Sequence, residues 1–288
     1  MEINDRRYIS VQHTLLGGSN FYGEDVPKTI TIKTTTTGDE LEKCAAEAFH
    51  NVMVEKILPR CIEPKFNFRK LLEIDYNIIL RKMLAVSCGP FVKPTNLTCS
   101  DCGAFIKNPE ELASLETVET TPIPEDIGDE IVCPAGELLY NEDEIHLRFT
   151  RVSNILSDSA LLQKLRQANA NITREQLQYE LSMNRLAYLL KSAGPPEEQK
   201  PFADFNFAIG YLKRMDANDI RMLAKFYSDA TTYGDSPLVK TKCPVCQGHN
   251  AEFQNVITAY SFRPTVEQLR AWRDLRRAES QAVPGDVK

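Results

Sequence analysis

The chain has 288 residues, a length that predicts one or two domains with a sizeable buried core. Its 34 basic and 40 acidic residues give a formal net charge of −6. The polar start "MEINDRRYIS" leads into no apolar segment, and no run of about 18 uncharged apolar residues occurs, so we expect neither a secretion signal nor a membrane partner. In the reducing cytoplasm that this implies, the eight cysteines are expected to be core residues and metal ligands rather than disulfides.

The acidic excess is concentrated in one interval. Between Lys107 and Arg148 there is no Lys or Arg, and the interval carries twelve carboxylates. Such a surface repels a phosphate backbone, so nucleic acid is not an expected partner. A solvated acidic face is the simplest interpretation of the tract.

The first 90 residues predict a strand followed by two helices. Ile30 and Ile32 alternate with Lys and Thr as in a strand, and a helix begins near Asp39, where carboxylates suit the positive helix end. Pro59 is expected to end that helix. A second apolar helical pattern fills 68–90, with Gly-Pro as its stop.

Residues 105–152 alternate short apolar pairs with Pro, Gly and acidic clusters, which predicts hairpin strands around Gly136 and Asn141. The period then changes to that of a helix. A capping box of Thr173 and Gln176 opens one helix, which is expected to end at the Gly-Pro-Pro that begins at 194.

Further helices are predicted at 204–215, from Asp216 to Gly234, and after a second capping box of Thr265 and Gln268. Two short strands, "NAEFQNVITAY" and "SFRP", are expected between the last two helices.

The predicted fold class is α+β, with helical segments inserted into a small β-rich region like a zinc ribbon and an N-terminal strand-helix extension. The predicted domains are the N-terminal strand plus helices at 1–90, a split zinc-ribbon β region at 91–152 and 235–263, a helical insertion at 153–234, and a C-terminal helix and tail at 264–288.

Two C-x-x-C pairs carry the clearest chemical signal in the sequence. Cys99 and Cys102 form the first, and Cys243 and Cys246 the second, each flanked by strand-like sequence and followed by a nearby glycine. Such knuckles point two thiolates at one tetrahedral cation, and four cysteines saturate zinc. The pairs predict one structural zinc in a ribbon interrupted by a domain-sized insertion.

Other interpretations of the pairs remain open. The four cysteines can be buried thiols without a metal, or a redox pair, although neither pair precedes the helix that lowers the pKa of a thioredoxin-like cysteine. Whether both pairs share one ion also remains open, because ordinary ribbons separate the pairs by only about 15 to 20 residues. Cys44, Cys61, Cys88 and Cys133 have no partner at ligand spacing; core packing is expected for them, with Cys88 and Cys133 as spare ligand candidates. His249 is expected to line the ribbon turn rather than to replace a thiolate.

No arrangement typical of an enzyme occurs in the sequence. The signatures of α/β-hydrolases, P-loops, dinucleotide-binding folds and zinc proteases are missing. The stretch "LLGGSN" at 15–20 has two glycines but is expected to precede a strand rather than follow one, so it does not predict a phosphate cradle. We therefore expect no enzymatic activity.

The order of segments resembles the baseplate hub assembly proteins of T-even-type contractile-tailed bacteriophages, including larger members with a split zinc ribbon. The segments are "GGSNFYGEDV", "ITIKTTTTGDE", "DYNIILRKMLAVSCGP", "IHLRFTRVSN", "DIRMLAKFYSDATTYGDSPLVKTKCPVCQGHNAEF" and "SFRP". Thr36, Asp39 and Glu40 stand at the helix-entry signal of that family, and the four paired cysteines stand at its knuckles. The second knuckle departs from the family pattern by reading Cys-Gln-Gly.

The resemblance implies a non-enzymatic baseplate component or assembly factor whose partners are other phage tail or baseplate proteins. It would work in the host cytoplasm during assembly, or in the virion tail baseplate. The alternative is a zinc-ribbon nucleic-acid-binding protein, which would need basic residues on the ribbon such as Lys240 and Lys242.

The last helix is the expected partner-binding element. It combines an apolar pair with several arginines, and interface cores favour Trp and Arg over Lys and Glu. The candidate contact residues are Leu269, Arg270, Trp272, Arg273 and Arg276. The competing interpretation is that Trp272 packs on the core of the chain itself while the arginines are solvated.

Overall fold

The computed structural model describes residues 10–36, 38–39, 42, 49–110, 112–168, 172–254 and 265–282. Their helices are α1 (Gly18–Tyr22), α3 (Phe49–Val52), α4 (Leu58–Cys61), α5 (Glu73–Cys88), α6 (Val152–Ala168), α7 (Arg174–Leu189), α8 (Phe205–Leu212), α9 (Ala217–Ala230) and α10 (Val266–Ala282). Residues 38–39 and 42 are also helical, as are a π-helical segment Met53–Ile57 and the 3-10 turns Phe68–Lys70 and Leu115–Thr117.

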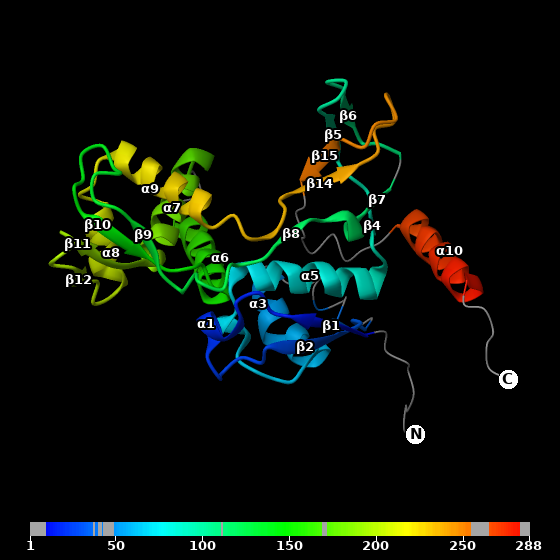
Figure 1. The fold of residues 1–288 in the computed structure, drawn as a ribbon, viewed down its shortest axis with the longest axis horizontal. Helices are drawn as coiled ribbons and strands as arrows, with labels where there is room; N and C mark the ends of the chain where they lie inside the picture. The colour runs from blue at the N-terminus through cyan, green and yellow to red at the C-terminus, as the bar shows by residue number, and fades with distance from the viewer. Residues whose placement is uncertain are drawn as a thin grey trace.

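The strands form several small antiparallel sheets, so the predicted α+β class is confirmed (Figure 1). The strands are β1 (Ser10–Thr14), β2 (Thr29–Lys33), β3 (Ile62–Glu63), β4 (Phe91–Val92), β5 (Asn96–Cys99), β6 (Phe105–Lys107), β7 (Ala113–Ser114), β8 (Thr120–Thr121), β9 (Ile131–Cys133), β10 (Glu144–Leu147), β11 (Leu190–Gly194), β12 (Lys200–Pro201), β13 (Gly234–Asp235), β14 (Leu238–Thr241) and β15 (Ala251–Gln254). Among the described helices, none is long and apolar enough to cross a bilayer.

Helix α5 lies against the sheet β1-β2-β3 and forms the centre of the main core (Figure 1). Its Tyr76, Ile79 and Met83 are fully buried, as are Ile30 and Ile32 of β2, which alternate as the sequence predicts. The helix ends where predicted, because Gly89 takes a φ of 88°, which a glycine adopts without strain.

The prediction that Pro59 ends the preceding helix is wrong, because α4 continues to Cys61. The π-helical turn Met53–Ile57 precedes Pro59 and re-phases the backbone, so that Pro59 occupies the first turn of a new helical segment, where its missing N–H costs no hydrogen bond.

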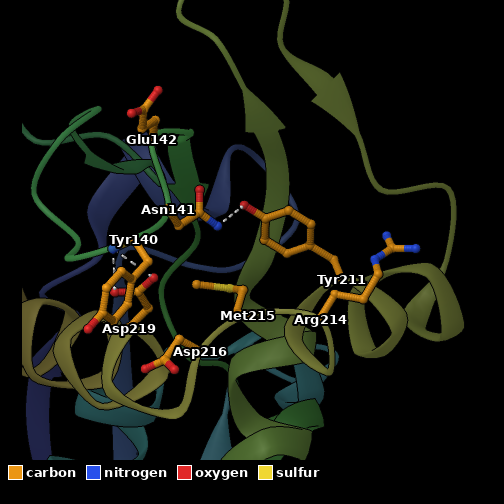
Figure 2. Close-up of a pocket in the computed structure, with 8 residues that line it drawn as sticks. All are labelled: Tyr140, Asn141, Glu142, Tyr211, Arg214, Met215, Asp216 and Asp219. Carbon is orange, nitrogen blue, oxygen red and sulfur yellow. Dashed lines mark hydrogen bonds between the residues drawn. The ribbon is translucent and has the colours of Figure 1, made fainter.

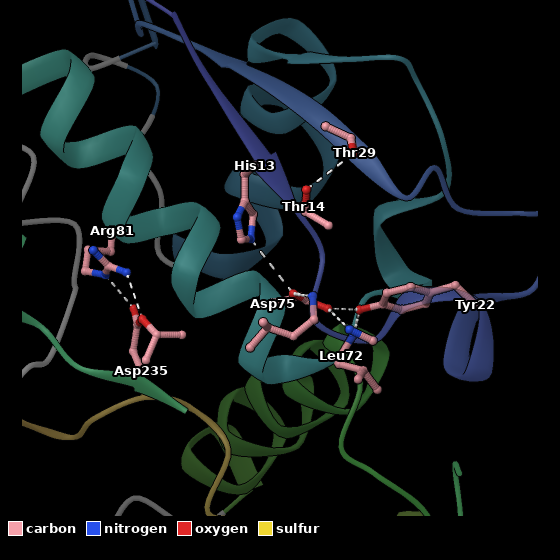
Figure 3. A network of polar contacts seen from close by, with 11 residues as sticks. His13, Thr14, Tyr22, Thr29, Leu72, Asp75, Arg81 and Asp235 are labelled. Carbon is pink, nitrogen blue, oxygen red and sulfur yellow. Dashed lines mark hydrogen bonds and ion pairs between the residues drawn. The ribbon is translucent and has the colours of Figure 1, made fainter. Parts of the chain in front are cut away.

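The glycine loop 15–20 is held by a buried carboxylate of α5 (Figure 3). Asp75 accepts hydrogen bonds from the N–H groups of Leu16 (2.7 Å) and Gly17 (3.0 Å) and from the Tyr22 hydroxyl (2.5 Å). The expectation that the loop lacks a preceding strand is wrong, since β1 ends at Thr14. A phosphate cradle is disfavoured there for another reason: the Asp75 carboxylate already occupies the N–H groups of Leu16 and Gly17.

His13 lies 3.9 Å from the same carboxylate, Nε2 to Oδ1, and is also buried. Burial, together with the charges of Lys82 and Arg81, lowers the pKa of His13 to about 4. The imidazole is therefore neutral at pH 7, and the anchoring of the loop depends on Tyr22 and the two N–H groups rather than on an ion pair.

A second antiparallel sheet, ordered β12-β11-β10-β9, lies in a lobe with helices α7, α8 and α9 (Figure 1). This pairing differs from the predicted division of the chain. Strands β9 and β10 were assigned to the ribbon region 91–152, but they pair with each other and with β11, inside the predicted helical insertion. The helix that was expected to end at Gly194 ends at Leu189, because residues 190–194 form strand β11.

The two chain segments that connect the lobe to the rest of the molecule pair with each other as β8 and β13 and run beside α5 (Figure 1). Arg81 of α5 bonds to Asp235 through Nε (2.6 Å) and Nη2 (2.9 Å), and Thr120 donates to the same carboxylate (2.8 Å; Figure 3). Both charged side chains are mostly buried, so this bidentate pair fixes both connections on one helix.

Candidate metal centre

Two β-hairpins far apart in the sequence form one four-stranded sheet, ordered β14-β15-β5-β6. Each hairpin carries one C-x-x-C knuckle in its turn. Strand β15 pairs with β5 so that Ala251 lies opposite Cys99, and this register brings the two knuckles to the same end of the sheet. The predicted strands "NAEFQNVITAY" and "SFRP" are described only as far as Gln254.

The four cysteine sulfurs form one cluster. Sγ of Cys99 lies 3.7 Å from Sγ of Cys246, and Sγ of Cys102 lies 3.8 Å from Sγ of Cys243. All four lie within 4.8 Å of one another. A tetrahedral zinc with Zn–S bonds of about 2.3 Å has S···S edges of about 3.8 Å, whereas a disulfide is about 2.05 Å long. The cysteines are therefore unpaired thiols spaced to hold a single metal ion.

The residue that follows each knuckle takes a left-handed conformation, with φ 69° at Gly103 and 61° at Gln247. In the second knuckle the left-handed residue is therefore Gln247 and not the nearby Gly248, whose Cα lies close to the Asp101 side chain of the first knuckle. The Gln247 amide donates to the Pro244 carbonyl (3.1 Å), which helps to hold the strained turn.

The ionisation of the four thiols is uneven. An N–H bond from Cys246 lowers the pKa of Cys243 to about 7, so this thiol ionises first. The N–H of Gly248 acts in the same direction on Cys246, but desolvation and the three neighbouring sulfurs outweigh it and raise the Cys246 pKa to about 12. The N–H of Ala104 lowers the pKa of Cys102, but desolvation and the Cys99 and Cys243 sulfurs outweigh it and raise that pKa. Four thiolates cannot lie this close together unless a cation neutralises them.

The ribbon has almost no core of its own. Its separate buried cluster consists of Cys99, Cys243 and Ala251. The other buried ribbon side chains, Leu97, Val239 and Phe253, belong to the main core and anchor the base of the sheet. The knuckle end therefore has few buried apolar contacts of its own to hold it together.

The remaining cysteines are placed as expected where the structure describes them. Cys61, Cys88 and Cys133 are buried and form no disulfide, and Cys44 lies outside the described residues. Within the described part of the chain, the four knuckle cysteines are the only cluster of metal-binding side chains found. His249 is exposed and is not part of it.

The C-terminal helix α10 packs on its own chain. A Cβ at Gly89 would lie 2.6 Å from the Trp272 ring, and the Gln268 amide donates to the Phe91 carbonyl (2.9 Å). Thr265 and Gln268 form the predicted capping box.

The other candidate contact residues of α10 lie away from this contact. Leu269 is 43% exposed, Arg270 is exposed, and Arg273 pairs only with the adjacent Asp274 (2.9 Å). The Arg276 side chain lies outside the described part of the structure. Contact between these residues and a partner protein stays a prediction.

The role of Asp75 was not predicted from the sequence. A carboxylate inside the apolar run "LLEIDYNIIL" was the available signal, because a fully buried Asp needs several donors and those donors had to come from another segment.

No family model, curated protein or solved structure matches the chain.

Proposed function

We propose that the protein is a non-enzymatic structural component or assembly factor of a contractile-tail baseplate hub, stabilised by one zinc ion. The observation that carries the metal role is the four-sulfur cluster, whose spacing fits the tetrahedral geometry of zinc. Four thiolate ligands leave no open position for water or substrate, so the ion is structural rather than catalytic.

The baseplate role is supported by the order of sequence segments described above. It also agrees with a metal that holds together distant parts of the chain, since the knuckles are separated by 141 residues. In such a protein the ribbon fixes the framework and the exposed surfaces of the insertion and of α10 contact partners.

On α10, the partner-facing residues would be Leu269, Arg270 and Arg273, because Trp272 packs against Gly89. Deletion of 264–288 separates the two roles of the helix. If the truncated chain keeps its thermal stability and no longer co-purifies with baseplate proteins, α10 is a docking element. If it unfolds, the helix serves its own fold, and Arg270→Glu with Arg273→Glu then tests docking without removing the Trp272 contact.

The central experiment combines metal analysis with virus assembly. Protein purified without chelator is expected to contain about one zinc per chain. Infection with a virus that lacks this gene is expected to give heads without complete contractile tails in electron micrographs. Normal tails in that experiment would contradict the baseplate role, and a zinc content near zero would contradict the metal role.

The nucleic-acid-binding alternative has one observation in its favour. One edge strand of the ribbon sheet, β6, carries exposed Phe105 and Lys107, and the opposite edge strand, β14, carries exposed Lys240. However, Lys240 lies 3.6 Å from Glu119 of the acidic tract, which weakens the positive charge of that edge. Binding of single-stranded RNA or DNA that weakens steeply with salt would favour this alternative.

A further inference from the structure

An open pocket of about 750 Å³ lies in the lobe, where the loop 138–142 meets the end of α8 and the start of α9 (Figure 2). Tyr140, Met215 and Tyr211 supply its apolar lining, and its charged lining residues come from the same three elements. No sequence signal pointed to this pocket, because its walls come from segments about 70 residues apart.

The pocket is preformed by buried hydrogen bonds. Asp219, which is 1% exposed, accepts from the N–H groups of Leu139 (2.7 Å) and Tyr140 (3.1 Å). The Tyr211 hydroxyl donates to Asp143 (2.7 Å) and accepts from the Asn141 amide (2.9 Å). A partner would therefore meet an ordered surface, which reduces the entropy that binding costs.

Large apolar side chains are exposed around this pocket. Tyr140 is 69% exposed, and Leu139, Phe207 and Met222 are also exposed. Phe207 stands one turn before Tyr211 on α8, and Met222 stands one turn after Asp219 on α9, so both lie beside pocket residues. Aromatic residues and Met are enriched in the cores of protein interfaces, whereas such residues rarely gather on a surface with no partner.

The negative charge of the pocket favours a positively charged partner. Glu142, Asp216 and Asp219 line it against one cation, Arg214. Among the described residues, neither Glu142 nor Asp216 has an ion-pair partner within 4.0 Å, and Figure 2 shows the Arg214 guanidinium directed away from Met215 and Asp216. The pocket therefore offers a net negative site beside an exposed tyrosine ring, which suits a positively charged side chain.

We propose that this pocket docks a basic and apolar segment of a partner protein. A Lys or Arg of the segment lies against the Tyr140 ring and the carboxylates of Glu142 and Asp216, while its apolar neighbours cover Phe207 and Met222. The inference rests on the proposed function, because it names the kind of partner through which a non-enzymatic assembly protein acts.

The test uses the full-length, metal-loaded protein and three fluorescent ten-residue peptides. One alternates Lys or Arg with Leu and Phe, the second replaces the basic residues with Glu, and the third replaces them with Gln. The basic peptide is expected to bind at least about tenfold more tightly than the other two, with an affinity that falls as salt rises.

Substitutions locate the binding. Tyr140→Ala is expected to weaken the basic peptide about tenfold or more, and Tyr140→Leu, which keeps an apolar side chain but removes the ring, is expected to weaken it less than Ala does. Glu142→Gln combined with Asp216→Asn removes two charges, while Asn at 216 still caps α9. The matched control is Phe105→Ala, an exposed aromatic on the ribbon, which should leave binding unchanged.

Equal binding of the three peptides, or binding that Tyr140→Ala leaves intact, would overturn the proposal. Tighter binding of a single-stranded oligonucleotide than of the basic peptide, lost on Tyr140→Ala, would instead make the pocket a nucleic-acid site and also overturn it. These outcomes are independent of the baseplate role, which fails only if tails assemble normally without the protein.

Discussion

Replacing Cys243 by Ser is expected to release the metal and open the knuckle end of the ribbon while the main core stays folded. The ribbon keeps only Cys99, Cys243 and Ala251 in a buried cluster of its own. Each buried CH₂ contributes about 0.8 kcal/mol, so this cluster supplies only a few kcal/mol. A structural zinc site supplies about 10–16 kcal/mol in small peptides.

The separation of the two knuckles along the chain determines the entropy cost of bringing them together, which a bound metal would offset. Joining Cys102 to Cys243 closes a loop of 141 residues, which costs about 4 kcal/mol of chain entropy. The β8–β13 pair already closes most of this loop, so the knuckles close only the shorter remainder. Each halving of the loop length removes about 0.6 kcal/mol of the entropy cost. The remaining cost nearly cancels the stability of the small cluster. Loss of the metal should therefore lower the free energy of local opening at the knuckles by at least about 3 kcal/mol, which corresponds to amide exchange there at least about a hundredfold faster.

The assay is zinc content by mass spectrometry together with hydrogen exchange resolved by segment. The matched control is Cys133→Ser, because Cys133 and Cys243 are both 0% exposed and either change buries a hydroxyl. In Cys243→Ser, zinc should fall to near zero and the two knuckles, with the ends of β14 and β15 that adjoin them, should exchange rapidly, while α5 and the base of the ribbon stay protected. In Cys133→Ser, zinc should be retained and the sheet β12-β11-β10-β9 should be the destabilised part.

Two results would refute this reasoning. The prediction assumes that the native protein contains zinc, so native protein purified without zinc would contradict it. Equal protection of the ribbon with and without metal would mean that its contacts to the main core are sufficient to hold both knuckles in place.

Further substitutions test the other features. Asp75→Ala leaves the two loop N–H groups and the Tyr22 hydroxyl without an acceptor, so the free energy of unfolding in urea should fall by about 3–5 kcal/mol. A fall of less than about 1 kcal/mol would contradict this role. Gly103→Ala meets no atom within 4 Å but must hold φ 69°, so zinc affinity measured against a competing chelator should fall about tenfold, and an unchanged affinity would show that the turn is not strained. Burial alone would lower the pKa of His146, but hydrogen bonds to Glu144 and Glu130 raise it. The protonated imidazole therefore stabilises the folded protein fully below pH 6.5, and this stabilisation is lost as pH rises through the raised pKa. In His146→Gln the free energy of unfolding should no longer show this loss. Finally, duplex and single-stranded DNA and RNA should bind no tighter than micromolar at low salt, because the acidic tract 108–147 repels them.

Local signals in the sequence predicted local structure well. The capping box at Thr173 and Gln176 makes both of its expected hydrogen bonds, and Asp204 and Asp216 cap α8 and α9. The two knuckles predicted the ribbon for the same reason, since C-x-x-C fixes a turn within a few residues. The meeting of the two knuckles was inferred from ligand chemistry, which requires four thiolates at one point.

Long-range pairing set the limits of prediction. The stretch "LKSAG" at 190–194 is compatible with continuing α7, and it becomes β11 only because β10 and β12 pair with it. Strand β1 was missed because "SVQHT" has weak alternation, and its buried His13 is accommodated by α5 rather than by any local pattern. The pocket beside Tyr140 depends on the same tertiary contacts, so no local motif marks it.

The β8–β13 pair holds the lobe to the central helix independently of the four-cysteine cluster. Because Arg81 fixes both connections on α5 through Asp235, the lobe is attached to the central helix without the metal. The ribbon base is attached to the same core by Leu97, Val239 and Phe253. The pocket that would receive a basic segment therefore stays formed when the knuckles open. In this arrangement a metal at the four cysteines would govern only the knuckle end of the ribbon, and a partner bound to the lobe would not sense its loss.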